Sequence, residues 1–252
     1  MRRLLLIGIG AGDPDHVTVQ AVGALNAFDV LFLVTKEGSD ELVALRRLVV
    51  DRHRTAGAYH AVELADPPRP WRSAPDYPAA VARWREQRVE LWEAAIGDEL
   101  DDDATGAFLV WGDPGLYESA LVVVQEIAAR GKVCFDHEVI PGVSAVHALT
   151  ARHRVPLNRV GGAVQITPAR LLAGGMPEGV DDVVVMLDAH ATFATLAPEG
   201  IDIYWGAYLG TADELLVHGP LGEVADEIVR LREDAKARKG WMLDTYLLRR
   251  AG

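Results

Sequence analysis

Short apolar runs alternate with longer segments of helical periodicity along almost the whole chain. Leu4–Ile9 is a continuous apolar run that ends in glycines, and the segment Val19–Ala27, which follows Thr18, repeats its apolar residues at helical spacing. A continuous apolar run indicates a strand that is buried on both faces, and threonine is a favoured N-cap residue. The alternation therefore predicts a layered α/β protein.

The pattern changes after about Arg154, where strands begin to outnumber helices and two of them lie close together in sequence. The segment Arg152–Gly162 combines charge, proline and paired glycines, which is typical of a domain boundary. We therefore predict two α/β domains, residues 1–155 with a parallel five-stranded sheet and residues 156–252 with a mixed sheet. The expected strands are Leu4–Ile9, Val30–Val34, Tyr59–Leu64, Ala107–Trp111, Lys132–Ile140, Ala163–Thr167, Asp182–Leu187, Ile203–Tyr208, Leu215–His218 and Met242–Leu248. The expected helices are Val19–Ala27, Glu41–Val50, Ala79–Glu99, Ser119–Arg130, Ala191–Ala197 and Glu223–Lys239.

Composition excludes several classes of protein. Half of the 252 residues are apolar, which is too much for a disordered chain. A single cysteine, Cys134, excludes an intramolecular disulfide and favours a reducing compartment. The net charge of −12 disfavours nucleic acid and anionic lipid as partners. No apolar run approaches the roughly 20 residues of a membrane span, no signal-peptide cleavage pattern follows the first residues, and the histidines lack metal-site spacing. We expect a cytoplasmic protein without a metal, a membrane or a nucleic-acid partner.

Three glycine-bearing loops each follow an expected buried strand. They span Gly8–Pro14, Trp111–Tyr117 and Pro141–Ala145, and the first two share the sequence Gly-Asp-Pro. Glycine lets a backbone approach a ligand closely. Because the carboxyl ends of parallel strands meet at one edge of a sheet, where α/β proteins bind ligands, we expect these loops to lie together.

Simpler explanations exist for each loop. The first has the spacing G-x-G-x-G rather than the dinucleotide pattern G-x-G-x-x-G, and the second strand ends without an acid to hold a ribose. The second loop could be only a type I turn. In the third, Ser144 could be only a helix N-cap, and Val146 stands where a hydrolase nucleophile elbow needs glycine.

These loops resemble the strand-end motifs of the tetrapyrrole methylase superfamily, which transfers methyl groups from S-adenosylmethionine. The chain departs from the pattern we expect at Thr35, at Pro168-Ala169 and at Glu118. The matching loop motifs are Gly8-x-Gly10-x-Gly12-Asp13-Pro14, Gly112-Asp113-Pro114-x-x-Tyr117 and Pro141-Gly142-x-Ser144. Longer strings, among them Ala151–Asn158, Ile203–Thr211 and Gly240–Arg249, are similar to a branch of the superfamily that acts on precorrins in cobalamin biosynthesis.

The resemblance implies a homodimer of two-domain subunits with the active-site cleft between the domains and S-adenosylmethionine as the cofactor. Asp113 is the expected polar anchor, because a carboxylate can accept hydrogen bonds from ribose hydroxyls or the methionine ammonium. The implied cofactor-binding residues are Ala11, Gly112, Asp113, Leu116, Ser144, Ala145, Met186, Leu187, Leu209, Gly210, Trp241 and Met242.

The reaction that the resemblance implies is methylation of carbon 1 of precorrin-5 with release of acetate, which gives precorrin-6A. Asp13, Tyr117 and Glu118 flank the Gly-Asp-Pro loops and are candidates for acid–base roles in the deacetylation. A precorrin carries many carboxylates, so an acidic protein needs a local cationic lining to bind it. Lys36, Arg47 and Arg154 are the substrate-binding candidates.

Two alternatives remain open. The same fold could methylate a different acceptor, either another precorrin carbon or a protein side chain. A third possibility is a binding module that holds a nucleotide-like ligand and performs no chemistry. Methyl gain and acetate loss on a panel of precorrins would separate the three.

Overall fold

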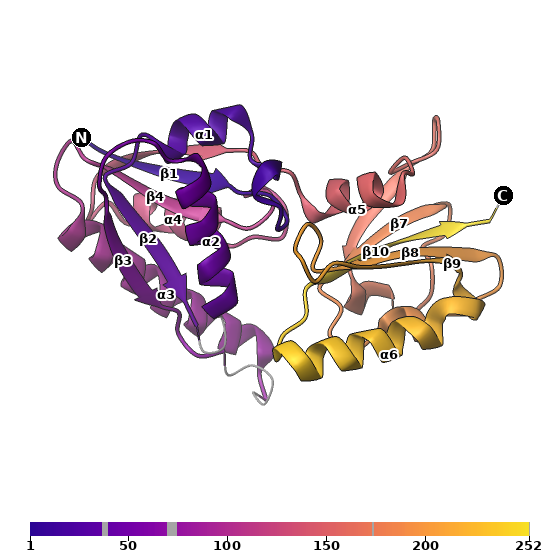
Figure 1. Cartoon of the computed structure of the whole chain (residues 1–252). Coiled ribbons are helices and arrows are strands. Elements are labelled where there is room, and N and C mark those ends of the chain that lie inside the picture. The colour runs from indigo at the N-terminus through magenta and orange to yellow at the C-terminus, as the bar shows by residue number, and fades with distance from the viewer. Residues whose placement is uncertain (37–39, 70–74, 173, 252) are drawn as a thin grey trace. The chain divides into compact units, whose positions relative to one another are not determined.

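The chain folds into two compact units, each with its own sheet (Figure 1). A computed structural model describes residues 1–36, 40–69, 75–172 and 174–251. The first unit comprises Met1–Gly10 with Pro14–Val143, and the second comprises Ala11–Asp13 with Ser144–Gly252. The chain thus passes from one unit to the other within the first and third glycine-bearing loops.

The first unit contains a five-stranded sheet in the order β3-β2-β4-β1-β5, and every neighbouring pair is parallel. The central strand segments are continuous apolar runs because both faces of the sheet are covered. This confirms the predicted parallel sheet. Its strands are β1 (Arg2–Gly8), β2 (Val30–Thr35), β3 (His60–Ala65), β4 (Thr105–Val110) and β5 (Phe135–Ile140).

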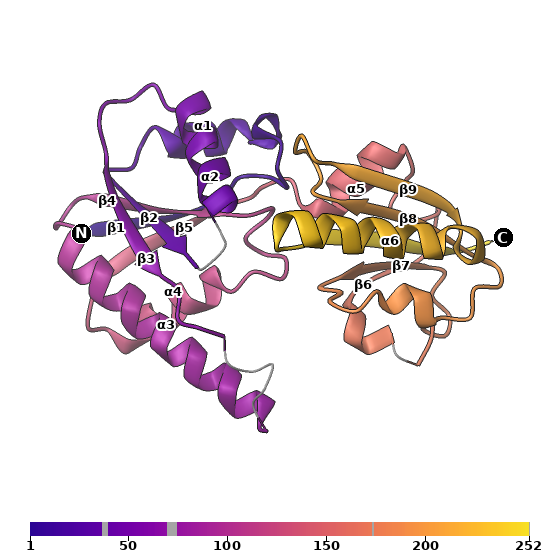
Figure 2. The same cartoon turned by 60° about the horizontal axis from the view of Figure 1, so that its bottom comes forward.

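Helices cover both faces of this sheet (Figures 1 and 2). One face carries α1 and α2, with a core that includes Leu25 and Val50, and the other carries α3 and α4, with a core that includes Trp92 and Val123. The Oγ1 atom of Thr18 accepts a hydrogen bond from the Ala21 amide at 3.1 Å, which confirms the predicted N-cap. The helices of this unit are α1 (Val19–Leu25), α2 (Asp40–His53), α3 (Tyr77–Glu99) and α4 (Ala120–Arg130), with the 3-10 turn η1 (Pro14–His16).

The second unit contains a mixed sheet in the order β6-β7-β10-β8-β9, as predicted. Strands β6 and β7 are parallel, whereas β10 runs antiparallel to both of its neighbours, and β9 runs antiparallel to β8. The strands β7 and β8 therefore end at the same edge at which β10 begins. The strands are β6 (Val164–Pro168), β7 (Asp182–Met186), β8 (Ile201–Ala207), β9 (Leu215–Pro220) and β10 (Asp244–Arg250).

The helices of the second unit differ from the prediction in two places. The helix α5 (Ala145–His153) was not predicted, since only its cap residue Ser144 carries a clear signal; α5 contacts β8, β9 and β10, so this segment belongs to the second unit rather than to residues 1–155. The predicted helix Ala191–Ala197 is only the 3-10 turn η4 (Thr192–Thr195). The remaining elements are η3 (Ala169–Leu172) and α6 (Leu221–Lys239), whose apolar side chains share one core with η4.

Among the residues that the structure describes, no helix combines the length and the apolar character that crossing a bilayer requires.

We expect the Trp92→Ala variant to lower the free energy of unfolding of the first unit by about 3–5 kcal/mol. The Trp92 side chain is 1% exposed and stacks on the ring of Phe108 with centroids 4.1 Å apart, so its removal leaves a cavity in the core. Urea denaturation followed by circular dichroism measures the change. The Leu48→Ala variant is the control, because Leu48 on α2 is 47% exposed; a Trp92→Ala loss no larger than that of the control would contradict the assignment of Trp92 to the core.

Candidate functional site

The three glycine-bearing loops meet in the first unit, backbone against backbone. A Cβ atom built on Gly142 would lie 2.1 Å from the carbonyl oxygen of Gly112, and one built on Gly8 would lie 2.6 Å from the amide nitrogen of Gly142. Gly10 and Gly112 also exchange two backbone hydrogen bonds, of 3.3 and 2.8 Å. Gly8, Gly10, Gly112 and Gly142 form what we call the glycine cluster. The expected convergence of the loops is therefore present, and no larger residue fits at position 142 without movement of the backbone.

Asp113 ties the second loop to the third. Its Oδ2 atom accepts a hydrogen bond from the Gly142 amide at 2.9 Å, and its Oδ1 atom accepts one from the Gly115 amide at 2.8 Å. Each oxygen keeps a lone pair that can accept a further hydrogen bond. The carboxylate thus has a structural role that the sequence did not reveal, and it can still receive a donor from a ligand.

The residues that follow Asp113 have different environments. Leu116 is half-buried and its amide donates to the Asp113 carbonyl at 3.2 Å. Tyr117 is 43% exposed and adopts a left-handed φ of 52°, which is unusual for a side chain of this size. The Oε1 atom of Glu118 accepts from the amides of Ser119 and Ala120 at 2.8 and 3.0 Å, so Glu118 caps the start of α4.

In the second unit, most of the other predicted cofactor-binding residues lie along one edge of the sheet. The register pairs Thr245 of β10 with Met186 of β7 on one side and with Gly206 of β8 on the other. We call this row the second-sheet edge. It consists of Met186 at the end of β7 and Leu187 after it, of Tyr208, Leu209 and Gly210 after β8, and of Trp241 and Met242 before β10.

The second-sheet edge contains two strained residues. Leu187 has a φ of 57° while 62% of it is exposed, and Tyr208 has a φ of 50°. Such conformations persist only where the surroundings hold them, and they are common at ligand sites. Two hydrogen bonds hold Tyr208: its amide donates to the Leu243 carbonyl at 3.0 Å and its hydroxyl donates to the Trp241 carbonyl at 2.7 Å.

The short segment Ala11–Asp13 packs against this same edge. A Cβ atom on Gly12 would lie 2.4 Å from the Leu209 carbonyl oxygen, and one on Gly210 would lie 2.5 Å from the Asp13 amide nitrogen. Ala11 is 4% exposed. The structure therefore brings Gly12 and Asp13, which follow Ala11, together with Leu209 and Gly210.

Ser144 begins α5 as its N-cap. The serine is 5% exposed, and its Oγ atom lies 3.4 Å from the His147 amide and 2.8 Å from Nδ1 of the same histidine. The structural role expected for Ser144 is thus confirmed. Ala145 follows as the first residue of the helix and is half-buried.

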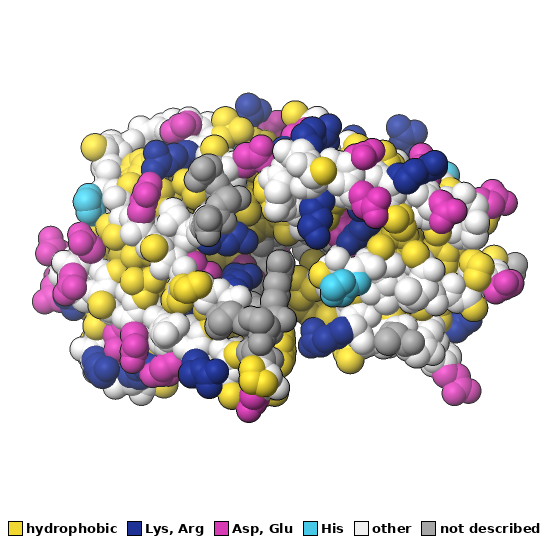
Figure 3. All heavy atoms as spheres, turned by 90° about the horizontal axis from the view of Figure 1, so that it is seen from below, with side chains coloured by type: hydrophobic (Ala, Val, Ile, Leu, Met, Phe, Trp, Pro, Cys, Tyr) yellow, Lys and Arg dark blue, Asp and Glu magenta, His cyan; other side chains and the backbone are white. Residues whose placement is uncertain are grey.

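Two of the three substrate candidates line an open pocket of about 510 Å³ at the carboxyl ends of β2 and β3. Lys36 and Arg47 line this pocket together with Asp66 and Glu63, and Arg47 forms an ion pair of 2.8 Å with Glu63. Burial and the neighbouring arginines Arg69, Arg46 and Arg88 lower the pKa of Lys36, against the opposite effect of Asp66. Basic and acidic side chains are interspersed over the face that Figure 3 shows.

Arg154, the third substrate candidate, belongs to the second unit. It is exposed and ends α5 with a left-handed φ of 58°. Its amide donates to the Ala151 carbonyl at 3.2 Å, as expected for a C-cap. The structure therefore gives Arg154 a helix-capping backbone and an exposed side chain.

Two further arginines lie beside the pocket, the half-buried Arg46 and the buried Arg88, and Arg88 was not singled out from the sequence. Strands β2 and β4 pair only as far as Phe32 and Phe108, and Arg46 of α2 donates to the next β4 carbonyl, that of Leu109, at 3.1 Å. Arg88 of α3, which is 6% exposed, forms a 3.0 Å ion pair with Asp66.

A signal for Arg88 was present in the sequence. Trp84 and Trp92 lie eight residues apart, on one face of a helix, with Arg88 four residues from each. The Arg88 guanidinium lies 5.2 and 4.7 Å from the two ring centroids. A charge in a buried aromatic stripe needs a partner. Here the partner is Asp66.

Within the described ranges, no group of three or more histidine, cysteine, aspartate or glutamate side chains is arranged to hold a metal ion.

Comparison with known proteins gives a consistent result. The family model of the Tetrapyrrole (Corrin/Porphyrin) Methylases matches residues 3–225. The chain is 45% identical to a precorrin-6A synthase (deacetylating) of Sinorhizobium sp over 251 residues, which cover 99% of this chain and 96% of that relative.

Solved structures agree in fold. The crystal structure of a cobalamin synthesis related protein (CobF) from Corynebacterium diphtheriae is 34% identical, has a TM-score of 0.85 and covers 100% of both chains. Uroporphyrin-III C-methyltransferase of Thermus thermophilus, solved in complex with S-adenosylhomocysteine, is 20% identical with a TM-score of 0.59 and covers 98% of this chain and 96% of that one, which shows the fold alone. The chain belongs to the tetrapyrrole methylase family.

Proposed function

We propose that this protein is an S-adenosylmethionine-dependent C-methyltransferase of cobalamin biosynthesis that methylates carbon 1 of precorrin-5 and releases acetate to give precorrin-6A. The observation that carries the proposal is the 45% identity to a precorrin-6A synthase, which extends over 99% of the chain. The loops that the family shares supply the chemistry of a nucleoside-binding site, because they offer backbone groups without side-chain bulk.

The residues of the chain fit S-adenosylmethionine. Gly142 lies directly against the Gly112 carbonyl and the Gly8 backbone, so these loops present backbone groups without side-chain bulk, and Leu187 presents an exposed apolar side chain from a constrained backbone. The proposed contacts of the first unit are Gly112, Asp113 and Leu116. Those of the second unit are Ala11, Ser144, Ala145, Met186, Leu187, Leu209, Gly210, Trp241 and Met242.

Orientation is the main task of these residues in methyl transfer. When bound, the cofactor supplies an electrophilic methyl group on a sulfonium. The protein needs to align that group with the nucleophilic carbon, which is worth many orders of magnitude in rate. Asp113 would hold the polar end of the cofactor, and the apolar side chains Leu116 and Leu187 would exclude water.

Loss of acetate requires a second set of groups. Water must add to the acetyl carbonyl, and a base or a hydrogen-bond donor lowers the barrier to that addition. Asp13 and Tyr117 remain the proposed residues for this role. Glu118 is not proposed for this role, since its Oε1 atom accepts hydrogen bonds from two amides at the start of α4.

Lys36, Arg47 and Arg154 are the proposed substrate-binding residues. The pocket that Lys36 and Arg47 share supports the first two, and the exposed side chain of Arg154 is compatible with the third. A homodimer and a cytoplasmic location remain predictions from the sequence and the family resemblance.

The activity itself can be tested by incubating the protein with S-adenosylmethionine and precorrin-5. We expect mass spectrometry to detect a corrinoid product that has gained a methyl group and lost its acetyl group, with release of acetate. Methyl gain without acetate release would favour a different acceptor carbon. Cofactor binding without turnover on any precorrin would contradict the proposed reaction.

The Gly142→Ala variant should weaken binding of S-adenosylhomocysteine at least tenfold, because the new methyl group would push apart the Gly112 and Gly142 backbones; such overpacking costs about 1–3 kcal/mol. Isothermal titration calorimetry measures the dissociation constant, and circular dichroism verifies the fold. Gly57→Ala is the matched control, since no heavy atom lies within 4 Å of its Cβ position. Equal affinities for the two variants would argue against cofactor binding at the glycine cluster.

The Lys36→Met variant should raise the KM for precorrin-5 about tenfold with a small change in kcat, because a charge-assisted hydrogen bond to a substrate carboxylate is lost. Lys132→Met is the control. The Lys132 side chain is 69% exposed and its ammonium pairs with Glu93, which also has Arg130 as a partner. If the Lys36→Met and Lys132→Met variants had the same KM for precorrin-5, Lys36 would be excluded from the substrate site.

A further inference from the structure

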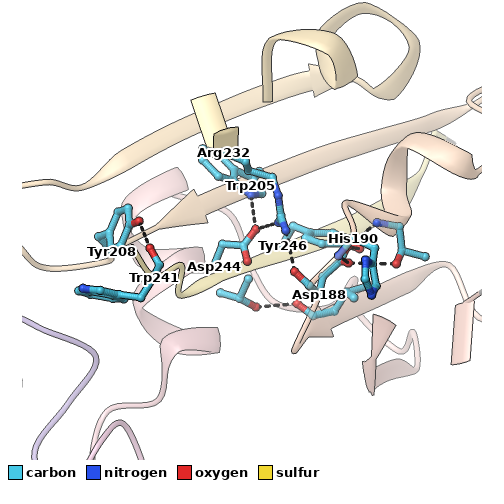
Figure 4. Close-up of polar contacts among 11 residues, drawn as sticks. Asp188, His190, Trp205, Tyr208, Arg232, Trp241, Asp244 and Tyr246 are labelled. Carbon is cyan, nitrogen blue, oxygen red and sulfur yellow. Dashed lines mark hydrogen bonds and ion pairs between the residues drawn. The ribbon is translucent and has the colours of Figure 1, made fainter. Parts of the chain in front are cut away.

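A buried ion pair lies at the second-sheet edge (Figure 4). Arg232 of α6 and Asp244, the first residue of β10, form this pair, and their side chains are only 9% and 3% exposed. The Nε1 atom of Trp205 donates a second hydrogen bond to the same Asp244 oxygen, at 2.8 Å. The start of β10 is therefore fixed by groups from α6 and from β8.

The same arginine also holds the segment that follows β7. The Nη2 atom of Arg232 donates to the Asp188 carbonyl at 2.6 Å. The Asp188 carboxylate in turn accepts hydrogen bonds from the Tyr246 hydroxyl and the Thr192 amide, both at 2.7 Å, and from the His190 amide at 3.0 Å. One guanidinium thus joins the end of β7 to the beginning of β10.

These two segments carry proposed cofactor contacts. Leu187 immediately precedes Asp188 and has the left-handed backbone described above, and Met242 lies two residues before Asp244. A residue in this conformation needs its neighbours to hold it. Arg232 acts on the residue directly after Leu187, so it is placed to fix that conformation.

Burial of this ion pair costs folding free energy, because Asp244 loses its hydration. Burial raises the pKa of Asp244 to about 6, although Arg232 and the Trp205 indole act to lower it, and the negative charge of Asp188 raises it further. Loss of hydration therefore outweighs the attraction between the partners. A buried pair of this kind is often replaceable by apolar residues without loss of stability, so its presence at the second-sheet edge calls for a role other than stability.

We propose that Arg232 is a positioning residue, whose contacts with the Asp244 carboxylate and the Asp188 carbonyl hold Leu187 and Met242 in the geometry that binds the cofactor. This inference rests on the proposed function, because it assumes that the second-sheet edge binds S-adenosylmethionine. Arg232 itself need not touch the cofactor.

The same two strands offer a matched control at their other ends. Arg249, near the end of β10, pairs with Asp182, the first residue of β7, at 2.5 Å, and their side chains are 12% and 1% exposed. Arg249 also donates to a backbone carbonyl, that of Pro156, at 2.9 Å. Loss of either arginine leaves a buried aspartate without its ionic partner, but only Arg232 adjoins the second-sheet edge.

The experiment compares Arg232→Met with Arg249→Met in the full-length protein. We expect both variants to melt at lower temperature than the wild type. Isothermal titration with S-adenosylhomocysteine should give a dissociation constant about tenfold higher for Arg232→Met and within about twofold of the wild type for Arg249→Met. The rate of methyl transfer at saturating cofactor should change less than the KM for S-adenosylmethionine.

The pH dependence of cofactor affinity distinguishes a positioning role of Arg232 from a purely structural one. Because the folded-state pKa of Asp244 is about 6, above its ordinary value of 3.8, the folded protein binds this proton more tightly, and stability falls as pH rises from about 4 to 6. Cofactor affinity should change in the opposite direction and rise over the same range, since only ionised Asp244 pairs with Arg232. In the Asp244→Asn variant, neither stability nor cofactor affinity should show this change between about pH 4 and 6. This variant replaces Arg232→Met in the test if Arg232→Met does not fold.

The outcomes separate this inference from the proposed function. Wild-type protein that binds S-adenosylhomocysteine, with equal affinities for the Arg232→Met and Arg249→Met variants, would overturn the positioning role and leave the proposed function intact. An affinity for S-adenosylhomocysteine that does not fall below pH 6 would also overturn it. Failure of the wild type to bind the cofactor would instead refute the proposed function.

Discussion

The candidate site depends on a direct approach of backbone to backbone. The Gly142 backbone lies so close to the Gly112 carbonyl that even a methyl group at position 142 would come within 2.1 Å of the carbonyl oxygen. Parallel strands bring the loops to one edge of the sheet, but only the absence of side chains lets them touch. The Asp113 carboxylate then fixes the contact through the amides of Gly115 and Gly142. The packing of the loops thus requires this sequence, in addition to the proposed role of the loops in cofactor binding.

The edge of the second sheet is shaped in a different way from the loops of the first unit, which depend on glycine. Its edge is built from larger residues that are held in strained conformations, namely Leu187 and Tyr208. Hydrogen bonds from Tyr208 to Trp241 and from Arg232 to Asp188 hold these conformations in place. Buried polar groups cost stability and give a defined geometry in return. An edge of this kind is suited to holding a ligand in one orientation.

Much of the fold follows from local sequence, and the exceptions have physical causes. Continuous apolar runs such as Leu4–Ile9 predict the buried strands of the first unit, because a run this short that ends in glycines is typical of a strand covered on both faces. The helix α5 was missed because its nine residues carry a weak periodic signal and are stabilised by packing on β8 and β10. Local sequence does not report such tertiary contacts.

The site was predictable at its loops and less so elsewhere. Glycine and proline motifs identify the glycine cluster, whereas the roles of Asp113 and Glu118 as acceptors of backbone hydrogen bonds depend on three-dimensional placement. Arg88 and Arg232 illustrate the remaining difficulty. Each is a charged residue on the buried face of a helix, and its partner, Asp66 or Asp244, comes from a different element. Only an isolated charge within an apolar stripe could have indicated them.

The central claim is that the strand-end loops bind S-adenosylmethionine, and hydrogen–deuterium exchange with and without S-adenosylhomocysteine tests it most directly. We predict slower exchange in the complex for amides of residues 112–116 and 142–145 in the second and third loops, and of residues 186–188 and 208–210 at the second-sheet edge. Unchanged exchange in these segments at saturating ligand, or protection confined to other parts of the chain, would contradict the account.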